Sequence, residues 1–298
     1  MESNDVYLYG MTVLSTIHSL NGKYPEADSY GEIEDTVLVP GGETGNSAII
    51  LANFGLKVKV DGPYLGNRTL KAISEFFQRL KIDCSNLFFD PSFDGVQDLV
   101  IIDRSSRTVF GRFGHYFRDK KRWNQPDPEA INQSRIVGID PFFHEESLKA
   151  AELAVASGKK YVSIDSPPDS YITRNAAAMV ISGEFIRNNY PTQDLESLLD
   201  SYTSLSDGLI IFTSGSKEIL YGRGNGSAGS VKPFSVDVKS TLGAGDTFRA
   251  GVLYGVLNNW DDRKTVRFAA ATSACVCKRF PMALDPPGLD EITALCQT

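Results

Sequence analysis

The chain has 298 residues, of which 42% are hydrophobic and 22% charged, a composition typical of a globular protein in the size range of one large α/β domain. Its formal net charge of −7 disfavours a general nucleic-acid-binding protein, which needs a basic face, but leaves small anionic substrates open. No apolar run reaches the roughly 18 residues of a membrane span, and the N-terminus lacks the basic and apolar regions of a signal peptide, so we expect a cytoplasmic protein without membrane partners.

Short apolar runs rich in β-forming residues recur along the chain. They predict strands at residues 6–10, 58–62, 98–103, 135–140, 160–165, 178–182 and 208–215. Segments with helix-like character lie between or after them, at residues 47–55, 70–80, 146–158, 194–202, 246–259 and 262–277. Several strands have few polar interruptions, as expected for strands that are buried on both faces. The alternation predicts an α/β fold with a mostly parallel sheet that is covered by helices on both sides.

Two segments, residues 12–40 and 93–118, interrupt this alternation. Residues 12–40 contain no convincing helix, and both segments include runs typical of extended chain, such as TVLVP at residues 36–40. We expect them to form a small sheet over one edge of the core. Because the chain shows no linker, repeat or low-complexity tract, residues 1–298 are predicted to form a single domain.

Residues 243–246 read GAGD and come directly before an apolar, helix-like run. Glycines let the backbone approach a ligand, and the first N–H groups of a helix that starts near Asp246 lack intrahelical partners, so this segment can bind a phosphate group. A carboxylate beside an anion site is explained if it is a general base that removes a proton from an attacking hydroxyl, as phosphoryl transfer to an alcohol requires. The alternative is that Asp246 is only an N-cap on a glycine loop.

Other motifs receive structural interpretations. The four cysteines form no CxxC pair and are predicted to be free thiols, and the three histidines show no metal-ligand spacing. Gly224, Gly226 and Gly229 form a GxGxxG pattern, but a further strand is expected after them, so we predict a hairpin turn rather than a dinucleotide site. The basic cluster at residues 118–122 (RDKKR) is interpreted as a solvated loop, and the alternative is that it reaches an anionic substrate.

Two stretches resemble the signatures of the ribokinase-like carbohydrate kinases. Residues 240–251 read STLGAGDTFRAG and resemble the C-terminal signature, whose usual form is DTTGAGDTFNAG. The N-terminal pattern is resembled by Gly41, Gly42, Asn46, Gly55 and Gly66. The order of the predicted strands and helices matches the family over nearly the whole chain. The resemblance implies a ribokinase-like three-layer sandwich with a mostly parallel central sheet and a small β-sheet lid, formed by residues 12–40 and 93–118.

The resemblance also implies a role for each matched position. Asp246 is the expected catalytic base, and the N–H groups of Gly243, Ala244 and Gly245 are expected to hold the transferring phosphoryl group. The positions expected to bind the sugar are Ser15, Gly41, Gly42 and Asn46. The positions expected to line ATP are Thr213, Gly215, Ser216, Ala270 and Cys277, with Glu184 as the expected magnesium residue. The lid is expected to cover the sugar and exclude water, and in this family it often mediates dimerisation.

Several positions depart from the family pattern. Ser15 and Ser240 stand where the family usually has Asp, Arg249 stands where it has Asn, and the NxxE motif tied to magnesium is absent. Further departures are Asn67, Arg68 and Phe280. Because Ser15 has a shorter reach than aspartate and no charge, we expect weak activity on ribose. Because Ser240 is neutral and a poorer ligand for a hard cation, we expect potassium to stimulate this protein less than its relatives.

The sequence thus predicts an ATP-dependent kinase that uses Mg²⁺ and transfers the γ-phosphoryl group to a hydroxyl of a small sugar or sugar-like alcohol. Two alternatives stay open: a nucleoside kinase of the same family, and a sugar-binding or regulatory homologue that has lost turnover. The intact GAGD segment favours the enzyme.

Overall fold

The computed structural model describes residues 4–103, 107–224 and 226–298. Within these residues, eight strands form a large sheet in the order β12-β11-β10-β9-β8-β7-β1-β4. Its strands are β1 (Val6–Tyr9), β4 (Val58–Asp61), β7 (Ile136–Ile139), β8 (Lys160–Ile164), β9 (Ala178–Ser182), β10 (Leu209–Thr213), β11 (Ile219–Gly222) and β12 (Ala228–Val231). The six strands from β4 to β10 are parallel, and β11 and β12 add antiparallel strands at one edge. The mostly parallel central sheet is therefore confirmed, and the GxGxxG pattern lies on the β11–β12 hairpin, as predicted.

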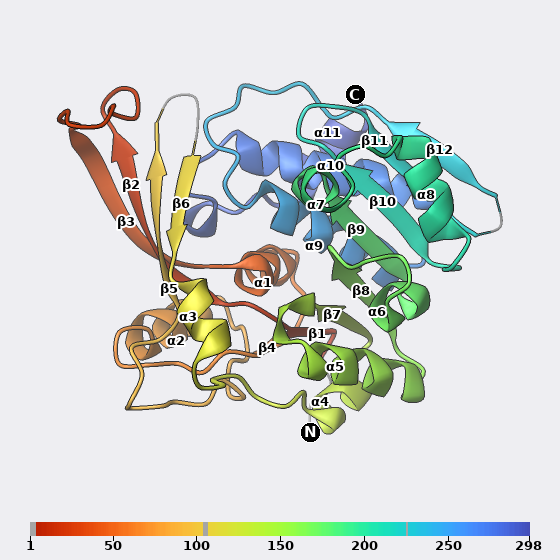
Figure 1. Ribbon diagram of the computed structural model, residues 1–298, viewed down its shortest axis with the longest axis horizontal. Coiled ribbons are helices and arrows are strands. Elements are labelled where there is room, and N and C mark those ends of the chain that lie inside the picture. Colours follow the sequence, from red (N-terminus) through yellow and green to blue (C-terminus); the bar gives the residue numbers. More distant parts are fainter. Residues whose placement is uncertain (1–3, 104–106, 225) are drawn as a thin grey trace.

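Four further strands within the described residues form a second sheet, in the order β3-β2-β5-β6. They are β2 (Val13–Leu20), β3 (Ile33–Gly41), β5 (Gln97–Ile102) and β6 (Arg107–Gly111). This second sheet projects from one end of the large sheet, on the left of Figure 1, and confirms the small sheet expected from residues 12–40 and 93–118. β2 pairs in parallel with β5, whereas β3 and β6 pair antiparallel to their neighbours.

The segment at residues 93–118 is not extended throughout, because it ends in a short helix, α3 (Phe113–Arg118). The aromatic side chains of Phe113, Tyr116 and Phe117 recur at helical spacing and pack on the apolar core. The rings of Tyr116 and Phe117 lie 5.5 and 6.0 Å from the ring of Trp123. Packing of these aromatic side chains against the core thus favours a short helix where the sequence analysis expected extended chain.

Helices cover both faces of the large sheet. One face packs against α1 (Glu43–Asn53), α9 (Ala244–Leu257) and α10 (Asp262–Cys277), and the other against α4 (Pro128–Gln133), α5 (Glu145–Ala156) and α8 (Leu195–Thr203). Further helices of the described residues are α2 (Leu70–Arg79), α6 (Tyr171–Asn175), α7 (Gly183–Asn189) and α11 (Leu289–Cys296). Alternate residues of β1 point to opposite faces of the sheet. Val6 and Leu8 pack in one apolar cluster, and Tyr7 and Tyr9 pack in the other. The expected three-layer arrangement follows from this alternation.

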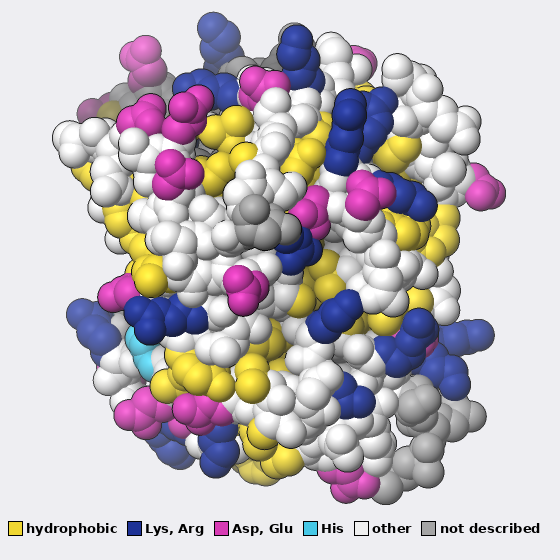
Figure 2. Space-filling view, turned by 90° about the vertical axis from the view of Figure 1, so that its right-hand side faces the viewer, with side chains coloured by type: hydrophobic (Ala, Val, Ile, Leu, Met, Phe, Trp, Pro, Cys, Tyr) yellow, Lys and Arg dark blue, Asp and Glu magenta, His cyan; other side chains and the backbone are white. Residues whose placement is uncertain are grey.

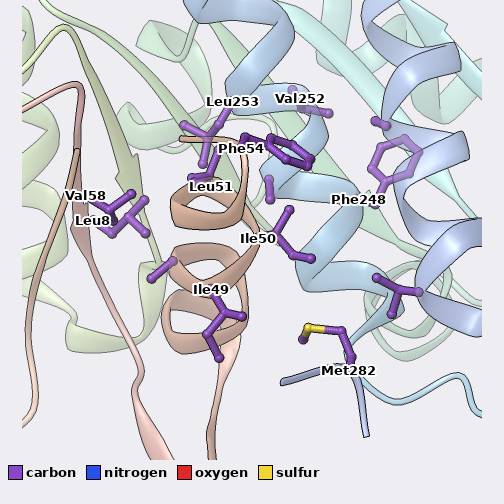
Figure 3. Close-up of a cluster of buried hydrophobic side chains, with 14 of the residues drawn as sticks. Leu8, Ile49, Ile50, Leu51, Phe54, Val58, Phe248, Val252, Leu253 and Met282 are labelled. Carbon is purple, nitrogen blue, oxygen red and sulfur yellow. The ribbon is translucent and has the colours of Figure 1, made fainter. Parts of the chain in front are cut away.

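The contact between α1 and α9 positions the ends of both helices. Ile49, Ile50 and Leu51 of α1 are fully buried, and Figure 3 shows α1 between Leu8 of β1 and Val252 of α9. A glycine with a positive φ precedes each helix. Gly42 has φ +82°, and Gly243 has φ +76° and is in the left-handed conformation. A Cβ atom at Gly42 would lie only 2.6 Å from the Met11 carbonyl oxygen, so this turn requires glycine.

A buried ion pair joins the large sheet to α9. Arg249 Nη1 contacts Asp140 Oδ1, and both side chains are 0% exposed. The second carboxylate oxygen of Asp140, Oδ2, accepts hydrogen bonds from Met11 N at 2.7 Å and Thr44 Oγ1 at 3.0 Å. Asp140 therefore ties the end of β7 to α9, to the segment after β1, and to the first turn of α1.

The surface beyond the antiparallel edge of the large sheet carries both signs of charge. Figure 2 shows Lys and Arg side chains interspersed with Asp and Glu on this face. Among the residues that the structure describes, none of the helices combines the length and the apolar character needed to cross a bilayer.

Replacing Arg249 with Met should destabilise the fold, because it leaves the Asp140 carboxylate buried without its ionic partner. Removing one member of a buried ion pair typically lowers the free energy of unfolding by about 3–5 kcal/mol. Asp140→Asn introduced into the Arg249→Met variant should recover part of this loss. Urea denaturation curves measure the effect, with Arg263→Met on the exposed face of α10 as the matched control. Equal unfolding free energies for Arg249→Met and the unchanged protein would contradict the prediction.

Candidate active site

A cavity of about 330 Å³ lies between the second sheet and the first turns of α1 and α9. It opens beside the carboxyl ends of the parallel strands, where open α/β sheets usually bind their ligands. Six residues that the sequence analysis placed in the site line this cavity: Ser15, Gly41, Gly42, Asn46, Gly243 and Asp246. Apolar walls complete it, among them Val109, Phe113, Phe117, Phe142 and Met282. Segments from both ends of the chain are thus brought to one place.

Asp246 lies in the first turn of α9 and points toward α1. Its Oδ2 accepts a hydrogen bond of 2.7 Å from Asn46 Nδ2, and its carbonyl oxygen accepts one of 3.0 Å from Ser47 Oγ. Burial raises the pKa of Asp246 above its ordinary value, and the charge of Asp140 adds to this effect. The hydrogen bond from Asn46 and the positive charges of Arg249 and Arg107 oppose the shift. The carboxylate is consequently positioned by Asn46 and is more basic than an exposed aspartate.

The N-terminus of α9 presents backbone donors beside this carboxylate. Helix α9 begins at Ala244, slightly before the expected start, because Gly243 takes the left-handed conformation and caps it. The N–H of Ala244 donates to Thr241 O at 3.3 Å, whereas the N–H groups of Gly245 and Asp246 have no acceptor among the described residues. A Cβ atom at Gly245 would meet nothing within 4 Å. This end of α9 therefore offers free N–H donors and open space, which suit an anion.

The loop before α9 is held by α10. The carbonyl oxygen of Cys277, the last residue of α10, accepts hydrogen bonds from Lys239 N at 2.8 Å and Ser240 N at 3.3 Å. The Oγ of Ser240 accepts a 3.1 Å hydrogen bond from Leu242 N. Ala270, further along α10, is 5% exposed within the apolar core. Of the two α10 residues expected near the nucleotide, Cys277 thus supports the loop that carries GAGD, and Ala270 packs in the core.

The other residues expected on the nucleotide side lie along the same edge of the large sheet. Thr213 ends β10, and Gly215 and Ser216 form the turn after it, with Gly215 at φ +57°. Among the described residues that line the 330 Å³ cavity, none of these three is found. Glu184 in the first turn of α7 lines a separate trough of about 720 Å³, together with Asp165 and Ser182. The cavity and the trough share Glu43, Phe117 and Phe142, so they adjoin one another.

The trough contains the carboxylates of Asp165 and Glu184, but its side chains do not form a complete metal-binding site. Within the described residues, no group of three or more His, Cys, Asp or Glu side chains could hold a metal ion. Asp165 accepts hydrogen bonds from Ser182 N at 2.6 Å and from Ser182 Oγ at 2.9 Å. This donor set fits Mg²⁺, which proteins usually hold through one or two carboxylates, with water and substrate phosphates completing the coordination.

Three charged residues in or beside the cavity were not found by sequence analysis, namely Glu43, Asp98 and Arg107. Glu43 follows Gly42 and lines both the cavity and the trough, and the signal was its place between the glycine pair and Asn46. Arg107 begins β6, and its Nη1 donates to Thr241 O at 3.0 Å and to Thr241 Oγ1. The arginine therefore connects the second sheet to the loop before α9.

The basic residues 118–122 do not line the cavity in the part of the chain that the structure describes, and Lys121 instead pairs with Glu146.

Glu43→Gln should stabilise the protein at alkaline pH. Burial, reinforced by the charges of Asp246 and Asp140, raises the pKa of Glu43 well above its ordinary value. A carboxyl group whose pKa is raised by folding contributes stability while it is protonated, and loses that contribution as the pH rises through the folded pKa. The variant should therefore have the higher Tm at pH 8, and the difference should vanish below about pH 4.

Thermal unfolding at several pH values measures this difference. The matched control is Glu145→Gln, which changes an exposed glutamate in the first turn of α5. If Glu43→Gln lowers Tm at pH 8, the proposed electrostatic penalty is wrong.

Known proteins are similar to this chain over most of its length. Ribokinase from Lactococcus lactis subsp. lactis (strain IL1403) is 22% identical over 95% of this chain and 97% of its own length. The 5-dehydro-2-deoxygluconokinase of Shouchella clausii (strain KSM-K16) is also 22% identical, over 86% of each chain. The structure of Arabidopsis thaliana ribokinase complexed with ribose and ATP superposes with a TM-score of 0.80 at 15% identity and covers 100% of both chains.

The match to the family extends over almost the whole chain. The profile described as pfkB family carbohydrate kinase matches residues 9–285, from the last residue of β1 to the segment before α11. Both the cavity and the GAGD segment lie inside these limits. The chain is therefore a member of the pfkB family of carbohydrate kinases.

Proposed function

We propose that this carbohydrate kinase transfers the γ-phosphoryl group of ATP to a hydroxyl of a small sugar or sugar-like alcohol. The observation that carries the proposal is the position of the Asp246 carboxylate, which lines the cavity beside the free N–H groups at the start of α9. A base for an acceptor hydroxyl and donors for a phosphoryl group are the two parts that this transfer needs. The ATP complex of the Arabidopsis thaliana ribokinase supports ATP as the donor.

In the proposed reaction, the acceptor oxygen attacks the γ-phosphorus while its proton passes to Asp246 Oδ1 or Oδ2. The bond between the γ-phosphorus and the bridging oxygen breaks, and ADP leaves with the electron pair of that bond. Asn46 orients the base through its 2.7 Å hydrogen bond, and the N–H groups of Gly245 and Asp246 stabilise the negative charge on the moving phosphoryl group. Mg²⁺, which Glu184 and Asp165 would help to hold, neutralises charge on the phosphates of ATP when it is bound.

The second sheet is proposed to act as the lid of a single-domain enzyme. Val13, Ile17 and Val109 place apolar side chains from this sheet over the cavity. Excluding water prevents it from competing as the acceptor and hydrolysing ATP. The exposed side chains of Ile33 and Leu38 on β3 support a homodimer through the same sheet.

Asp246→Asn should abolish most of the turnover and leave ATP binding intact. Asparagine preserves the shape of the side chain but cannot accept the proton, and general-base assistance is typically worth about 10²–10⁴ in rate. ADP release over a panel of sugars and nucleosides identifies the best acceptor, and calorimetry measures ATP affinity. The matched control is Asp237→Asn, an exposed carboxylate in the loop before α9. Retention of more than about a tenth of the turnover would place the base elsewhere.

Arg107→Ala should shift the acidic limb of the pH-rate profile to higher pH. The positive charge of Arg107 lowers the pKa of Asp246, so its removal should leave the base protonated over a wider pH range. The loss of the contacts with Thr241 should also raise KM for ATP, because the loop before α9 loses its link to the second sheet.

The control for this prediction is Arg112→Ala, which removes an exposed arginine at the other end of β6. Arg107→Lys keeps the positive charge and should retain most of the normal pH profile. An unchanged acidic limb in Arg107→Ala would show that its charge does not reach the base.

A further inference from the structure

A carboxylate of the second sheet faces the cavity at a position next to Ser15. Ser15 on β2 and Asp98 on β5 are direct partners in the parallel pairing of these strands, and both line the cavity. Ser15 is the position where the sequence comparison expected an aspartate. The carboxylate is thus present in the cavity, but on the neighbouring strand.

Asp98 has an acceptor oxygen that the protein does not satisfy. The Ser15 side chain interacts with the Asp98 carboxyl group, yet Oδ1 is buried and has no hydrogen-bond partner among the described residues. Buried acceptors are normally paired, because an unpaired one loses the hydrogen bonds that water would provide. A ligand hydroxyl or ammonium group in the cavity would supply the missing donor.

The charges around the cavity define which ligands it accepts. The described lining residues include three carboxylates, Glu43, Asp98 and Asp246, and no lysine, arginine or histidine. The remaining walls are largely apolar, with Phe113, Phe117 and other aromatic side chains in the lining. The charged side chains that an anionic group on the acceptor would meet in this lining are all carboxylates, which together with its loss of hydration disfavours such a group.

We infer that Asp98 is the carboxylate that anchors the acceptor, and that the acceptor is a non-anionic polyol, either uncharged or carrying an amino group. The inference rests on the proposed kinase function and narrows its substrate class. Sugar acids and sugar phosphates are excluded as good acceptors. The cavity therefore differs in chemistry from one suited to a gluconate, the kind of acceptor that the name of the Shouchella clausii relative indicates.

The test compares acceptors that share a carbon skeleton and differ in their charged groups. Glucose, glucosamine, gluconate and glucose 6-phosphate form one series, and fructose and ribose with their phosphates form two more. Calorimetry with a non-hydrolysable ATP analogue measures binding, and ADP release measures turnover. The best neutral or amino acceptor should bind at least tenfold more tightly than its anionic derivatives. Asp98→Asn should raise its KM at least tenfold and change kcat less than twofold, because the base is untouched.

A positional rescue separates this role from a structural one. The double variant Ser15→Asp with Asp98→Ser returns the carboxylate to β2, and it should recover most of the affinity lost in Asp98→Asn. The matched control is Asp35→Asn, which removes an exposed carboxylate from β3 of the same sheet. Unfolding curves confirm that each variant is folded.

The outcomes distinguish this inference from the proposed function. Anionic acceptors that bind as tightly as neutral ones, or an Asp98→Asn variant with unchanged KM and selectivity, overturn the inference even if phosphoryl transfer is observed. Failure of every neutral and amino acceptor to bind overturns it as well. Selective, Asp98-dependent binding without ADP release supports the inference and instead contradicts the proposed transfer reaction.

Discussion

The hydrogen bond between Asn46 and Asp246 depends on one packing contact, that of α1 against α9. Ile49 and Ile50 of α1 are completely buried in the apolar layer that also contains Val252 of α9. Because both helices start at the same edge of the sheet, this contact brings their first turns together. The position of the base, the direction of the free N–H groups and the floor of the cavity all follow from it. A change that separated the two helices would dismantle the site without touching a polar residue.

The site concentrates negative charge where the fold excludes water. Asp140 and Asp246 both have raised pKa values, chiefly because burial disfavours their charged forms, and Arg249 opposes the shift of each. Such an arrangement is unfavourable for folding but useful for a base, since a raised pKa increases the tendency of the carboxylate to accept a proton. The buried arginine, which departs from the family pattern, lets the chain keep these acids close together.

The sequence was sufficient for the parts of the fold that depend on local patterns. Strand and helix periodicity predicted the layers, and GAGD indicated Asp246 because its glycines, carboxylate and helix are adjacent in the chain. The role proposed for Asp98 was missed because this residue lies in an apolar strand, and only the pairing of that strand with β2 brings Asp98 next to Ser15 in the cavity. Arg107 was missed for the same reason, since its partner Thr241 is distant in sequence. Register and long-range contacts are set by tertiary packing, which local patterns do not encode.

The parallel pairing of β2 with β5 has a consequence for the order in which the molecule assembles. β2 and β3 can pair as a hairpin early, but β5 can join β2 only after α1, β4 and α2, which lie between them in the chain, have folded back. Contacts between residues that are far apart in the sequence form slowly, because a long loop must close first. The wall that contains Asp98 is therefore completed after the β2–β3 hairpin and not together with it. Its strands are also candidates for the first local opening of the finished protein, which a bound acceptor that bridges them would suppress.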